Sequence, residues 1–352
     1  MKTKKGGFMY MNMFFIILLV AKMPLANYYL NHQMTSYTAQ ELAKWDVVVT
    51  GVENEVNNPN LLSYIRQQNP SIKLIPYVAS EEIPSNYAGH EPSGGPLHQL
   101  YESLPLSCYL KDKDGNQILF WGSNKVLNLT NNNGWVNHLV NWVKGNVKGS
   151  GYWDGIFYDN IWNDISWLNP KIDADNDGVA DNASTLNSNW QTGVNSLLYK
   201  TRSQCGSGFL IVINGGDTRN LPHINGSLKE SFNKNGNPSE WVAGIELVKN
   251  LVAGATYPPI IILNFEGTET DIGKMRFGLA TTLLINNCYF SYDAGLTPPY
   301  HCALWWYPDY DLDLGNPTGQ HYQQGELWIR NFSNGIVLVN PSYISQSYSL
   351  SG

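Results

Sequence analysis

The sequence predicts an α/β protein folded as one (β/α)8 TIM barrel with a small C-terminal β extension. Short apolar segments alternate with amphipathic segments along most of the 352 residues, which is the pattern of strands followed by helices. Eight such apolar segments can be counted, and the length suits one barrel, typically ~250 residues, with extensions. A doubly wound sheet would require a glycine-rich turn after its first strand, and the sequence has neither that turn nor a P-loop.

The elements of the predicted barrel can be placed in order along residues 26–310. The strands begin near Ala26, Trp45, Ile72, Gly155, Phe209, Gly226, Pro259 and Cys288. The helices between them begin near Leu61, Trp135, Leu186, Trp241 and Ile272. The sixth strand, in GSLKESF, is short and polar and therefore the least regular. After the barrel, ELWIRNFSNGIVLVNPS alternates around the turn SNG and predicts a hairpin, so residues 311–352 form the β extension packed on the barrel.

The segment 1–25 has the pattern of a secretory signal. Lys2, Lys4 and Lys5 precede an apolar run from Phe14 to Ala21, and cleavage could follow Ala21 or Ala26. The run is too short for a stable membrane span, so we expect a secreted or cell-surface protein. The alternative is that FFIILLV is a buried strand. Export permits disulfides, but the spacing of the four cysteines does not define a pairing.

Composition narrows the class of partner. The net charge is -7 and the 22 lysines and arginines are scattered, which excludes nucleic acid as an expected partner. Trp, Tyr, Asn and Gly are plentiful whereas charged residues are only 14%, and aromatic and amide side chains suit sugars. We therefore expect a carbohydrate substrate. The sequence does not define the oligomeric state.

Polar residues follow the predicted strands at the end where barrel enzymes place their active sites. The acids among them repel one another and lose solvation, which is costly unless they have a function. Glycoside hydrolysis requires two carboxyl groups, one that protonates the leaving oxygen and one that attacks or activates water. We predict Asp159 and Glu230 as this catalytic pair. The alternatives are a structural hydrogen-bonding role for Asp159 and a surface position for Glu230.

Further residues are predicted to face the sugar. They are Trp121, Asn128, Asn160, Asn214, Glu266, Tyr292, Asp293, Trp305 and Trp306. Each has packing as its alternative, and the Trp305-Trp306 pair is either a stacking platform or a wedge beneath the extension. His223 and His301 lie on predicted loops at the same rim and are expected substrate contacts.

An acidic loop after the fourth strand predicts one structural Ca2+. Asp173, Asp175, Asp177 and Asp181 lie at alternating positions around Gly178, as in EF-hand-type loops. The twelfth position is Ser184 instead of a glutamate, so Asp181 must complete the shell together with the Val179 carbonyl. The spacing resembles the calcium loops of thrombospondin-like repeats. The alternative is a solvated acidic loop, and no cofactor is expected for catalysis.

Several segments together resemble a known family. VLNLTN, GWVNHLVNWVKG, WDGIFYDN, IVING, LKESF and WWYPDYDLDLGNP are similar to hypothetical glycosyl hydrolase family fifteen, a barrel family distantly similar to polygalactosaminidase-like and α-galactosidase-like barrels. The similarity runs from about Tyr28 to Pro341, and DGIFYDN is its most specific part. It implies a retaining pair with Asp159 as nucleophile and Glu230 as acid/base.

Two other functions compete with a retaining glycosidase. The first is a non-catalytic carbohydrate-binding barrel, because a fold does not define a function. The second is a metal-dependent hydrolase, but the seven histidines do not follow the predicted strands as a set. A serine hydrolase would require G-x-S-x-G, which does not occur.

Overall fold

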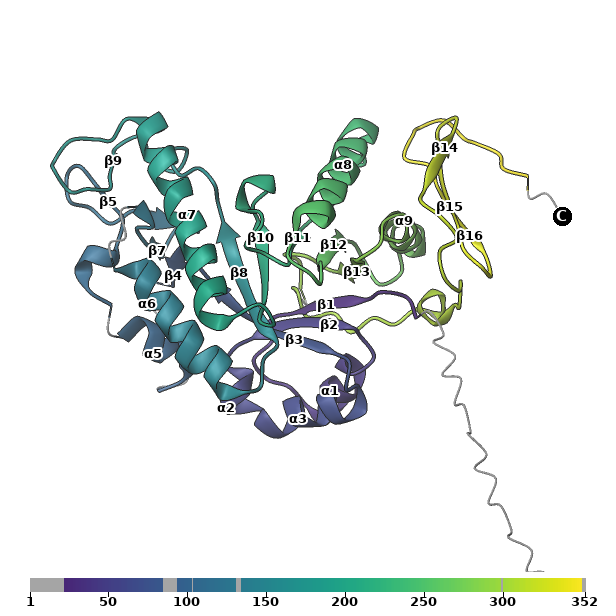
Figure 1. Ribbon diagram of the computed structural model, residues 1–352, viewed down its shortest axis with the longest axis horizontal. Helices are drawn as coiled ribbons and strands as arrows, with labels where there is room; N and C mark the ends of the chain where they lie inside the picture. The colour runs from purple at the N-terminus through teal and green to yellow at the C-terminus, as the bar shows by residue number, and fades with distance from the viewer. Residues whose placement is uncertain (1–21, 85–93, 103, 131–133, 299, 350–352) are drawn as a thin grey trace, which may run out of the picture.

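An eight-stranded parallel sheet forms the centre of the molecule in the computed structural model (Figure 1), which describes residues 22–84, 94–102, 104–130, 134–298 and 300–349. Its order is β1-β2-β3-β8-β10-β11-β12-β13. The first and last strands approach each other, because Phe290 N donates to Pro24 O at 2.9 Å and Leu25 bridges Phe290. All eight predicted barrel strands are present: β1 (Ala26–Tyr29), β2 (Val47–Gly51), β3 (Lys73–Ala79), β8 (Gly155–Ile161), β10 (Leu210–Gly215), β11 (Gly226–Lys229), β12 (Ile261–Glu266) and β13 (Cys288–Asp293).

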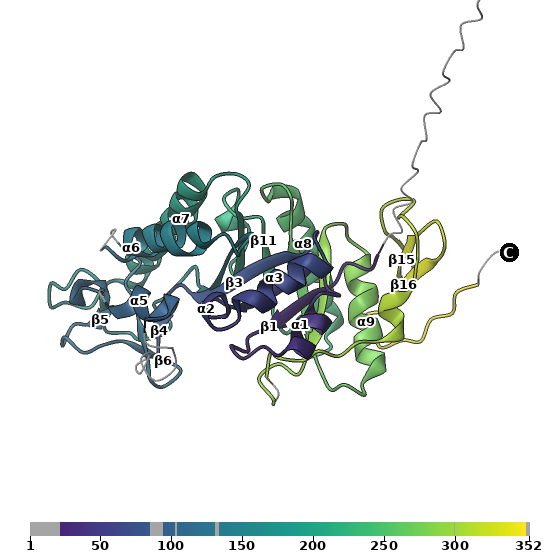
Figure 2. The same cartoon turned by 90° about the horizontal axis from the view of Figure 1, so that it is seen from below.

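Helices cover the outside of this sheet, as Figures 1 and 2 show. The longer ones are α3 (Pro59–Gln68), α6 (Trp135–Trp142), α7 (Ala183–Cys205), α8 (Pro238–Gly254) and α9 (Ile272–Leu283), and α1 (Ser36–Leu42) has 7 residues. A π-helical turn, Val143–Lys148, continues α6. Short helices are α2 (Asn54–Asn57) and α5 (Pro96–Glu102), and 3-10 turns occur at Leu106–Cys108, Thr218–Asn220 and Pro308–Asp311. The predicted (β/α)8 barrel is therefore confirmed, with only a 3-10 turn between β10 and β11.

The long polar segment after β3, together with a short strand from the loop after β8, forms small antiparallel sheets beside the barrel. One has the order β4-β7-β6 and the other joins β5 to β9. Their strands are β4 (Glu82–Ile83), β5 (Lys111–Asp112), β6 (Leu119–Phe120), β7 (Asn124–Val126) and β9 (Ile172–Asp173). Strand β4 follows soon after β3 in the chain and therefore lies near the rim end of β3.

The interior of the barrel is filled by residues at every second strand position. Phe157, Val212 and Leu228 belong to this buried cluster together with Tyr28 and Ile262. Two residues further along β8, β10 and β11 the same face carries polar side chains. The alternation of the strands therefore turns Asp159, Asn214 and Glu230 toward the mouth of the barrel.

Close contact between strands explains why the short sixth strand begins with glycine. A Cβ atom on Gly226 would lie 1.7 Å from the Ile260 carbonyl oxygen. The irregular composition of this strand thus has a steric cause, and β11 still pairs in parallel with β10 and β12.

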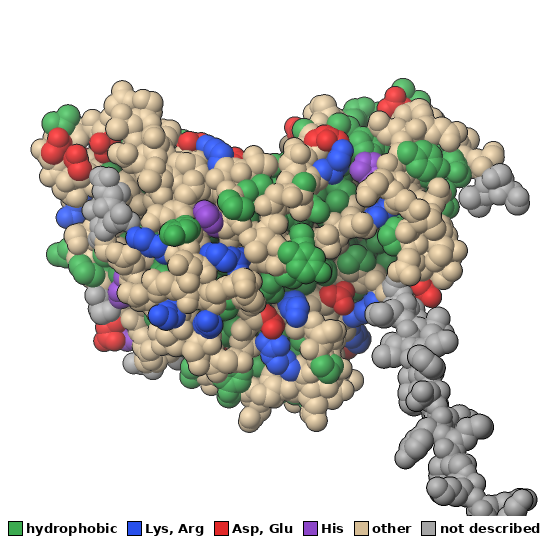
Figure 3. All heavy atoms as spheres, viewed as in Figure 1, with side chains coloured by type: hydrophobic (Ala, Val, Ile, Leu, Met, Phe, Trp, Pro, Cys, Tyr) green, Lys and Arg blue, Asp and Glu red, His purple; other side chains and the backbone are tan. Residues whose placement is uncertain are grey.

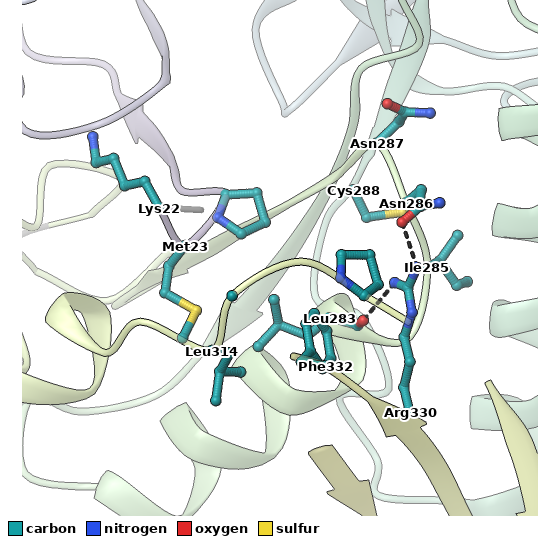
Figure 4. Close-up of a pocket in the computed structure, with 13 residues that line it drawn as sticks. Lys22, Met23, Leu283, Ile285, Asn286, Asn287, Cys288, Leu314, Arg330 and Phe332 are labelled. Carbon is teal, nitrogen blue, oxygen red and sulfur yellow. Dashed lines mark hydrogen bonds between the residues drawn. The ribbon is translucent and has the colours of Figure 1, made fainter. Parts of the chain in front are cut away.

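The C-terminal extension is a three-stranded antiparallel sheet, β14 (Tyr322–Gln324), β15 (Leu327–Asn331) and β16 (Ile336–Val339). The predicted hairpin corresponds to β15 and β16. Arg330 of β15 is 2% exposed and donates to the Leu283 carbonyl, the last residue of α9, at 2.8 Å. A cation at a helix C-terminus is favourable, so Arg330 fastens the extension to the barrel. A cavity of about 160 Å³ lies beside this contact (Figure 4).

The expected signal segment falls mostly on residues 1–21, which lie outside the described residues. Met23 and Leu25 are buried against the barrel. A leader that ended at Ala21 would leave these closing contacts in place, whereas cleavage after Ala26 would remove them. Within the described residues, no helix is long and apolar enough to cross a membrane. All four cysteines are among the described residues, and none of them forms a disulfide.

Candidate active site

The two predicted catalytic carboxyl groups lie next to each other at the mouth of the barrel. The amide nitrogen of Asn214 is 2.9 Å from Oδ1 of Asp159 and 2.7 Å from Oε2 of Glu230. Because one nitrogen contacts both oxygens, the distance between these two oxygens cannot exceed the sum of the two N···O distances. Retaining glycosidases place their carboxyl groups about 5–5.5 Å apart, and inverting enzymes ~6.5–9.5 Å apart. The shared amide therefore keeps the nearest oxygens closer together than the inverting arrangement does.

Asp159 is buried and held from several directions. The Tyr77 hydroxyl donates to its Oδ2 at 2.5 Å, and the Asn214 amide donates to Oδ1. The backbone N–H and the hydroxyl of Ser80 both donate to the Asp159 carbonyl, which fixes the end of β8 against the end of β3. Burial raises the pKa of Asp159, while the bonds from Tyr77 and Asn214 oppose that shift by stabilising the anion.

Glu230 has a different electrostatic environment. Nε2 of His301 lies 3.2 Å from its Oε1, and Nδ1 of His301 lies 3.2 Å from Oδ2 of Asp293. The bond from His301 is the main cause that lowers the pKa of Glu230. Despite its burial, the two neighbouring carboxylates raise the pKa of His301 to about 10. The two carboxyl groups on either side of the imidazole thus favour its protonated form.

A cavity of about 430 Å³ lies over these groups. Its walls combine aromatic rings with hydrogen-bonding side chains, a combination that suits a sugar ring. Three predicted sugar-facing residues, Trp121, Asn160 and Asn214, are among the residues that line it. The full lining is Tyr28, Leu30, Tyr77, Glu82, Trp121, Asn124, Asp159, Asn160, Asn214, Glu230, Leu296 and His301.

Two adjacent acids after β3 were not predicted from the sequence; Glu82 lines the cavity, and Glu81 lies buried next to it in the chain. Glu81 is fully buried and accepts a hydrogen bond from the Trp162 backbone at 2.9 Å. Glu82 is 4% exposed and accepts from the Asn160 amide at 2.9 Å. Burial is the main cause that raises the pKa of Glu82 to about 7, and the charge of Asp159 adds to it. Hydrogen bonds to the Glu82 carboxylate partly oppose this shift. Asn160 itself has a φ of 57°, and such strained residues cluster at functional sites.

A second cavity of about 420 Å³ lies along the same rim, beyond β12 and β13. Two predicted sugar-facing residues, Glu266 and Trp305, line it. Glu266 pairs with Lys234 at 3.3 Å and also accepts from the Ser231 hydroxyl. Ser231 adjoins Glu230, so the two cavities are neighbours at the C-terminal ends of the strands.

The side chains of other predicted sugar-facing residues form hydrogen bonds within the protein. Asn128 is 1% exposed, donates to the Ala174 carbonyl and accepts from Thr130, so its side chain braces the loop around residue 174. The Tyr292 hydroxyl donates to the Thr268 carbonyl. Asp293 reaches the cavity only through His301, because its carboxylate is bonded to His301, Asn264 and the Gly295 backbone.

The remaining two expected contacts lie away from the catalytic cavity. Trp306 packs edge-on against Trp45, which lies just before β2, and its indole N–H donates to Asp311. These contacts favour packing over sugar stacking for Trp306. His223 stands just before β11 and packs on Tyr199, so it lies at the opposite end of the strand from Glu230. The prediction that His223 lies at the rim is wrong.

The acidic loop is folded as a compact turn between β9 and α7. Ligand atoms of Asp173, Asp175 and Asp177 all lie within 4.8 Å of one another, the one such group found among the described residues. Asp173 is buried and accepts from the Asp177 and Gly178 backbones. Asp181 instead accepts from the Ala174 backbone at 2.7 Å. Val179 is exposed at the tip of the turn.

The fold and the site together define a class of protein. A (β/α)8 barrel that holds paired carboxyl groups at the C-terminal ends of its strands, in a cavity walled by aromatic and amide groups, is a glycoside-hydrolase-like barrel. The chain belongs to hypothetical glycosyl hydrolase family 15, whose sequence model matches residues 66–336. Its function is therefore carbohydrate-active, and the resemblance inferred from the sequence motifs is confirmed.

Solved structures agree with this fold. The glycoside hydrolase domain of PelA from Pseudomonas aeruginosa matches with a TM-score of 0.53 and 16% identity, over 77% of this chain and 94% of that one. The cycloalternan-forming enzyme from Listeria monocytogenes matches with a TM-score of 0.51 and 9% identity, over 80% of this chain but only 29% of that one. At these identities the similarity shows the barrel alone. No curated protein matches the sequence.

Proposed function

We propose that the protein is a retaining glycosidase that cleaves a polysaccharide or oligosaccharide with Asp159 and Glu230. The observation that carries this proposal is the single amide of Asn214, which contacts Asp159 at 2.9 Å and Glu230 at 2.7 Å. The nearest oxygens of two carboxyl groups bridged by one amide stand closer than the ~6.5–9.5 Å by which inverting enzymes separate their carboxyl groups to admit a water molecule.

The reaction has two steps. In the first, an Asp159 oxygen bonds to the anomeric carbon while the glycosidic C–O bond breaks, and Glu230 gives its proton to the departing oxygen. In the second, Glu230 takes a proton from water, and the water oxygen replaces Asp159 on the anomeric carbon. Tyr77 and Asn214 hold both Asp159 oxygens in place, so the attacking group is oriented before the sugar arrives.

The two rim cavities would share the substrate. In the catalytic cavity, Trp121 offers an exposed ring for stacking, and Asn160 and Asn214 offer amides to sugar hydroxyl groups. In the neighbouring cavity, Trp305 would stack on a more distant sugar unit, with Lys234 and Glu266 bonding its hydroxyls. An occupant of both cavities would be an oligosaccharide or a polymer.

Export and calcium complete the proposal. Residues 1–21 would direct secretion, which places the enzyme where polysaccharides are found. One Ca2+ would bind Asp173, Asp175 and Asp177, whose carboxylates lie within reach of one ion, with the Val179 carbonyl and Asp181 completing the shell. Because Asn128 ties this turn to the segment after β7, the ion would brace the rim without touching the sugar.

A polysaccharide panel tests the proposed function. Purified protein is incubated with a set of neutral, acidic and amino-sugar polymers, and new reducing ends are measured. We expect at least one polymer to be cleaved by the wild-type protein and not by Asp159→Asn. Tight binding of a polymer without cleavage, by both proteins, would instead identify a carbohydrate-binding barrel.

A further inference from the structure

His301 connects two carboxylates that come from different strands. It lies on the segment after β13 and is 5% exposed. Its Nε2 contacts Glu230, which follows β11, and its Nδ1 contacts Asp293, which ends β13. When both carboxyl groups are ionised, both ring nitrogens must donate to them, which requires the doubly protonated imidazolium. His301 also lines the catalytic cavity, so its expected contact with substrate stays a prediction beside this internal role.

The surroundings of His301 are built to keep it in this orientation. Its carbonyl accepts from the Leu30 backbone at 2.8 Å, and the Tyr28 ring packs with its centroid 4.6 Å from that of the imidazole. On the far side, the Asn264 amide donates to Asp293 at 3.0 Å and the Gly295 backbone donates to it at 2.7 Å. Several elements therefore hold one ring, which is the arrangement expected of a group that orients another.

Each of the two carboxylate oxygens of Glu230 therefore has a partner. Oε1 faces His301 and Oε2 accepts from Asn214. The carboxyl plane is thus fixed by two donors, one of which also holds Asp159. Loss of His301 would leave Glu230 held at one oxygen only.

We propose that His301, held by Asp293, is a positioning residue that fixes the carboxyl group of Glu230 and sets the pH range in which the catalytic pair works. This inference rests on the proposed glycosidase function. The charged and titratable groups that face His301 are Glu230, Asp293 and Tyr28, and Lys234 and Asp159 add their charges to Glu230.

The direction of the pH effect follows from these charges. Glu230 must carry a proton to assist the first step, but the imidazolium lowers its pKa. Activity of the wild-type protein should therefore begin to fall at an acidic pH, where Glu230 loses its proton. Replacing His301 with a neutral residue raises the pKa of Glu230 and moves this alkaline limb of the pH profile upward. An opposite charge in contact typically changes a pKa by about 1–3 units.

Two variants separate charge from orientation. His301→Gln keeps an amide that can donate to Glu230 but removes the charge. Asp293→Asn keeps His301 but removes the carboxylate that helps to hold the ring protonated. The alkaline limb of this variant's pH profile should therefore lie between those of the wild type and His301→Gln. His223→Gln is the matched control, because its imidazole lies at the opposite end of the barrel.

The experiment measures kcat/KM against pH for these four proteins on an aryl glycoside of a sugar identified by the polysaccharide panel, together with NMR titration of the His301 ring. We expect the alkaline limb to move upward by about one unit or more in His301→Gln, to stay in place in His223→Gln, and the wild-type ring to remain protonated above pH 8. Two results would overturn the inference and leave the proposed glycosidase function untouched. One is turnover by His301→Gln with the alkaline limb of its pH profile in the wild-type place, and the other is a wild-type His301 ring that titrates near its ordinary pKa. Failure of the proposed function appears differently, as absence of turnover by the wild-type protein.

Discussion

Asn214 is the residue that connects the two carboxyl groups of the proposed catalytic pair. Its amide donates to both, while the second partner of each carboxyl differs: Tyr77 for Asp159 and His301 for Glu230. The neutral hydroxyl and the cationic ring give the two acids different environments. Burial raises the pKa of Asp159 and His301 lowers the pKa of Glu230, which is the reverse of the order usual for a nucleophile and its proton donor, so the assigned roles rest on geometry.

Replacing Asp159 with asparagine tests the nucleophile. The change keeps the shape of the side chain and removes the attacking charge, so we expect turnover to fall on the order of 10³-fold or more. The thermal midpoint should stay at or above that of the wild type, because a buried acid is replaced by a neutral group. The measurements are steady-state kinetics and a melting curve. Wild-type turnover by Asp159→Asn would show that another group attacks the sugar.

Replacing Glu230 with glutamine tests the proton donor. A glycoside with a poor leaving group depends on protonation and should lose about 10²–10⁴-fold in rate. A dinitrophenyl glycoside leaves without a proton, so its first step should be nearly unaffected. The measurement is kcat/KM over a series of aryl glycosides. A loss that is the same for every leaving group would assign proton donation to a different residue.

The sequence predicted some of these residues and could not predict others. Asp159, Asn214 and Glu230 follow apolar strand segments, so their position at the rim can be read from the strand pattern. Tyr77 lies inside a strand and resembles a core residue, and Glu82 belongs to a two-residue strand that no pattern marks. The contact of His301 with Asp293 joins residues whose approach depends on the path of the loop between them.

At the scale of the elements, strand positions were predictable because each apolar run is buried on both faces in a parallel barrel. The weakest, β11, has only four residues, and a glycine is required where it touches Ile260. The small sheets after β3 were not predictable, since two-residue strands carry no periodicity. The sequence predicts Trp305 and Trp306 together as sugar contacts, because adjacency in the sequence does not reveal that the Trp306 ring packs against Trp45.

The acidic turn between β9 and α7 makes a prediction about calcium. Loss of solvation and the charge of Asp177 both raise the pKa of Asp175, so a cation that neutralises the cluster should stabilise the folded protein. We expect calcium to raise the melting temperature of chelator-stripped protein and Asp175→Asn to reduce this rise. Magnesium is the control ion, since the turn suits a larger, flexible shell. Calorimetry that detects no binding at millimolar calcium would rule the site out.

At the scale of the whole molecule, the buried acids of the site should reduce stability as the pH rises. The pKa of Glu82 is raised from 4.5 to about 7, so the folded state binds this proton more tightly than the unfolded state does. The stabilisation is complete below about pH 4.5 and is lost as the pH rises through 7. A shift of this size corresponds to roughly 3 kcal/mol in the free energy of unfolding.

Glu82→Gln should remove this part of the pH dependence. We expect the variant to gain stability relative to the wild type at pH 8 and to lose that advantage at pH 4.5, as measured by urea unfolding at both pH values. Glu246→Gln, which changes an exposed side chain on α8, serves as the control and should keep the wild-type dependence. An equal difference between Glu82→Gln and wild type at both pH values would mean that Glu82 titrates in its ordinary range.

The surface of the molecule agrees with a carbohydrate partner. In the face shown in Figure 3, lysines and arginines are dispersed among acidic and apolar side chains instead of forming one basic patch. With a net charge of -7, this leaves no electrostatic footprint for nucleic acid on that face. The acids of the proposed catalytic pair lie at the barrel mouth.

The stereochemistry of the first product tests the retaining pair most directly. Cleavage of a substrate by the wild-type protein is followed by proton NMR from the first minutes, before the anomers of the released sugar equilibrate. Two carboxyl groups bridged by the single amide of Asn214 predict that the new reducing end first appears with the anomeric configuration of the substrate. First appearance of the opposite anomer would contradict a covalent intermediate on Asp159.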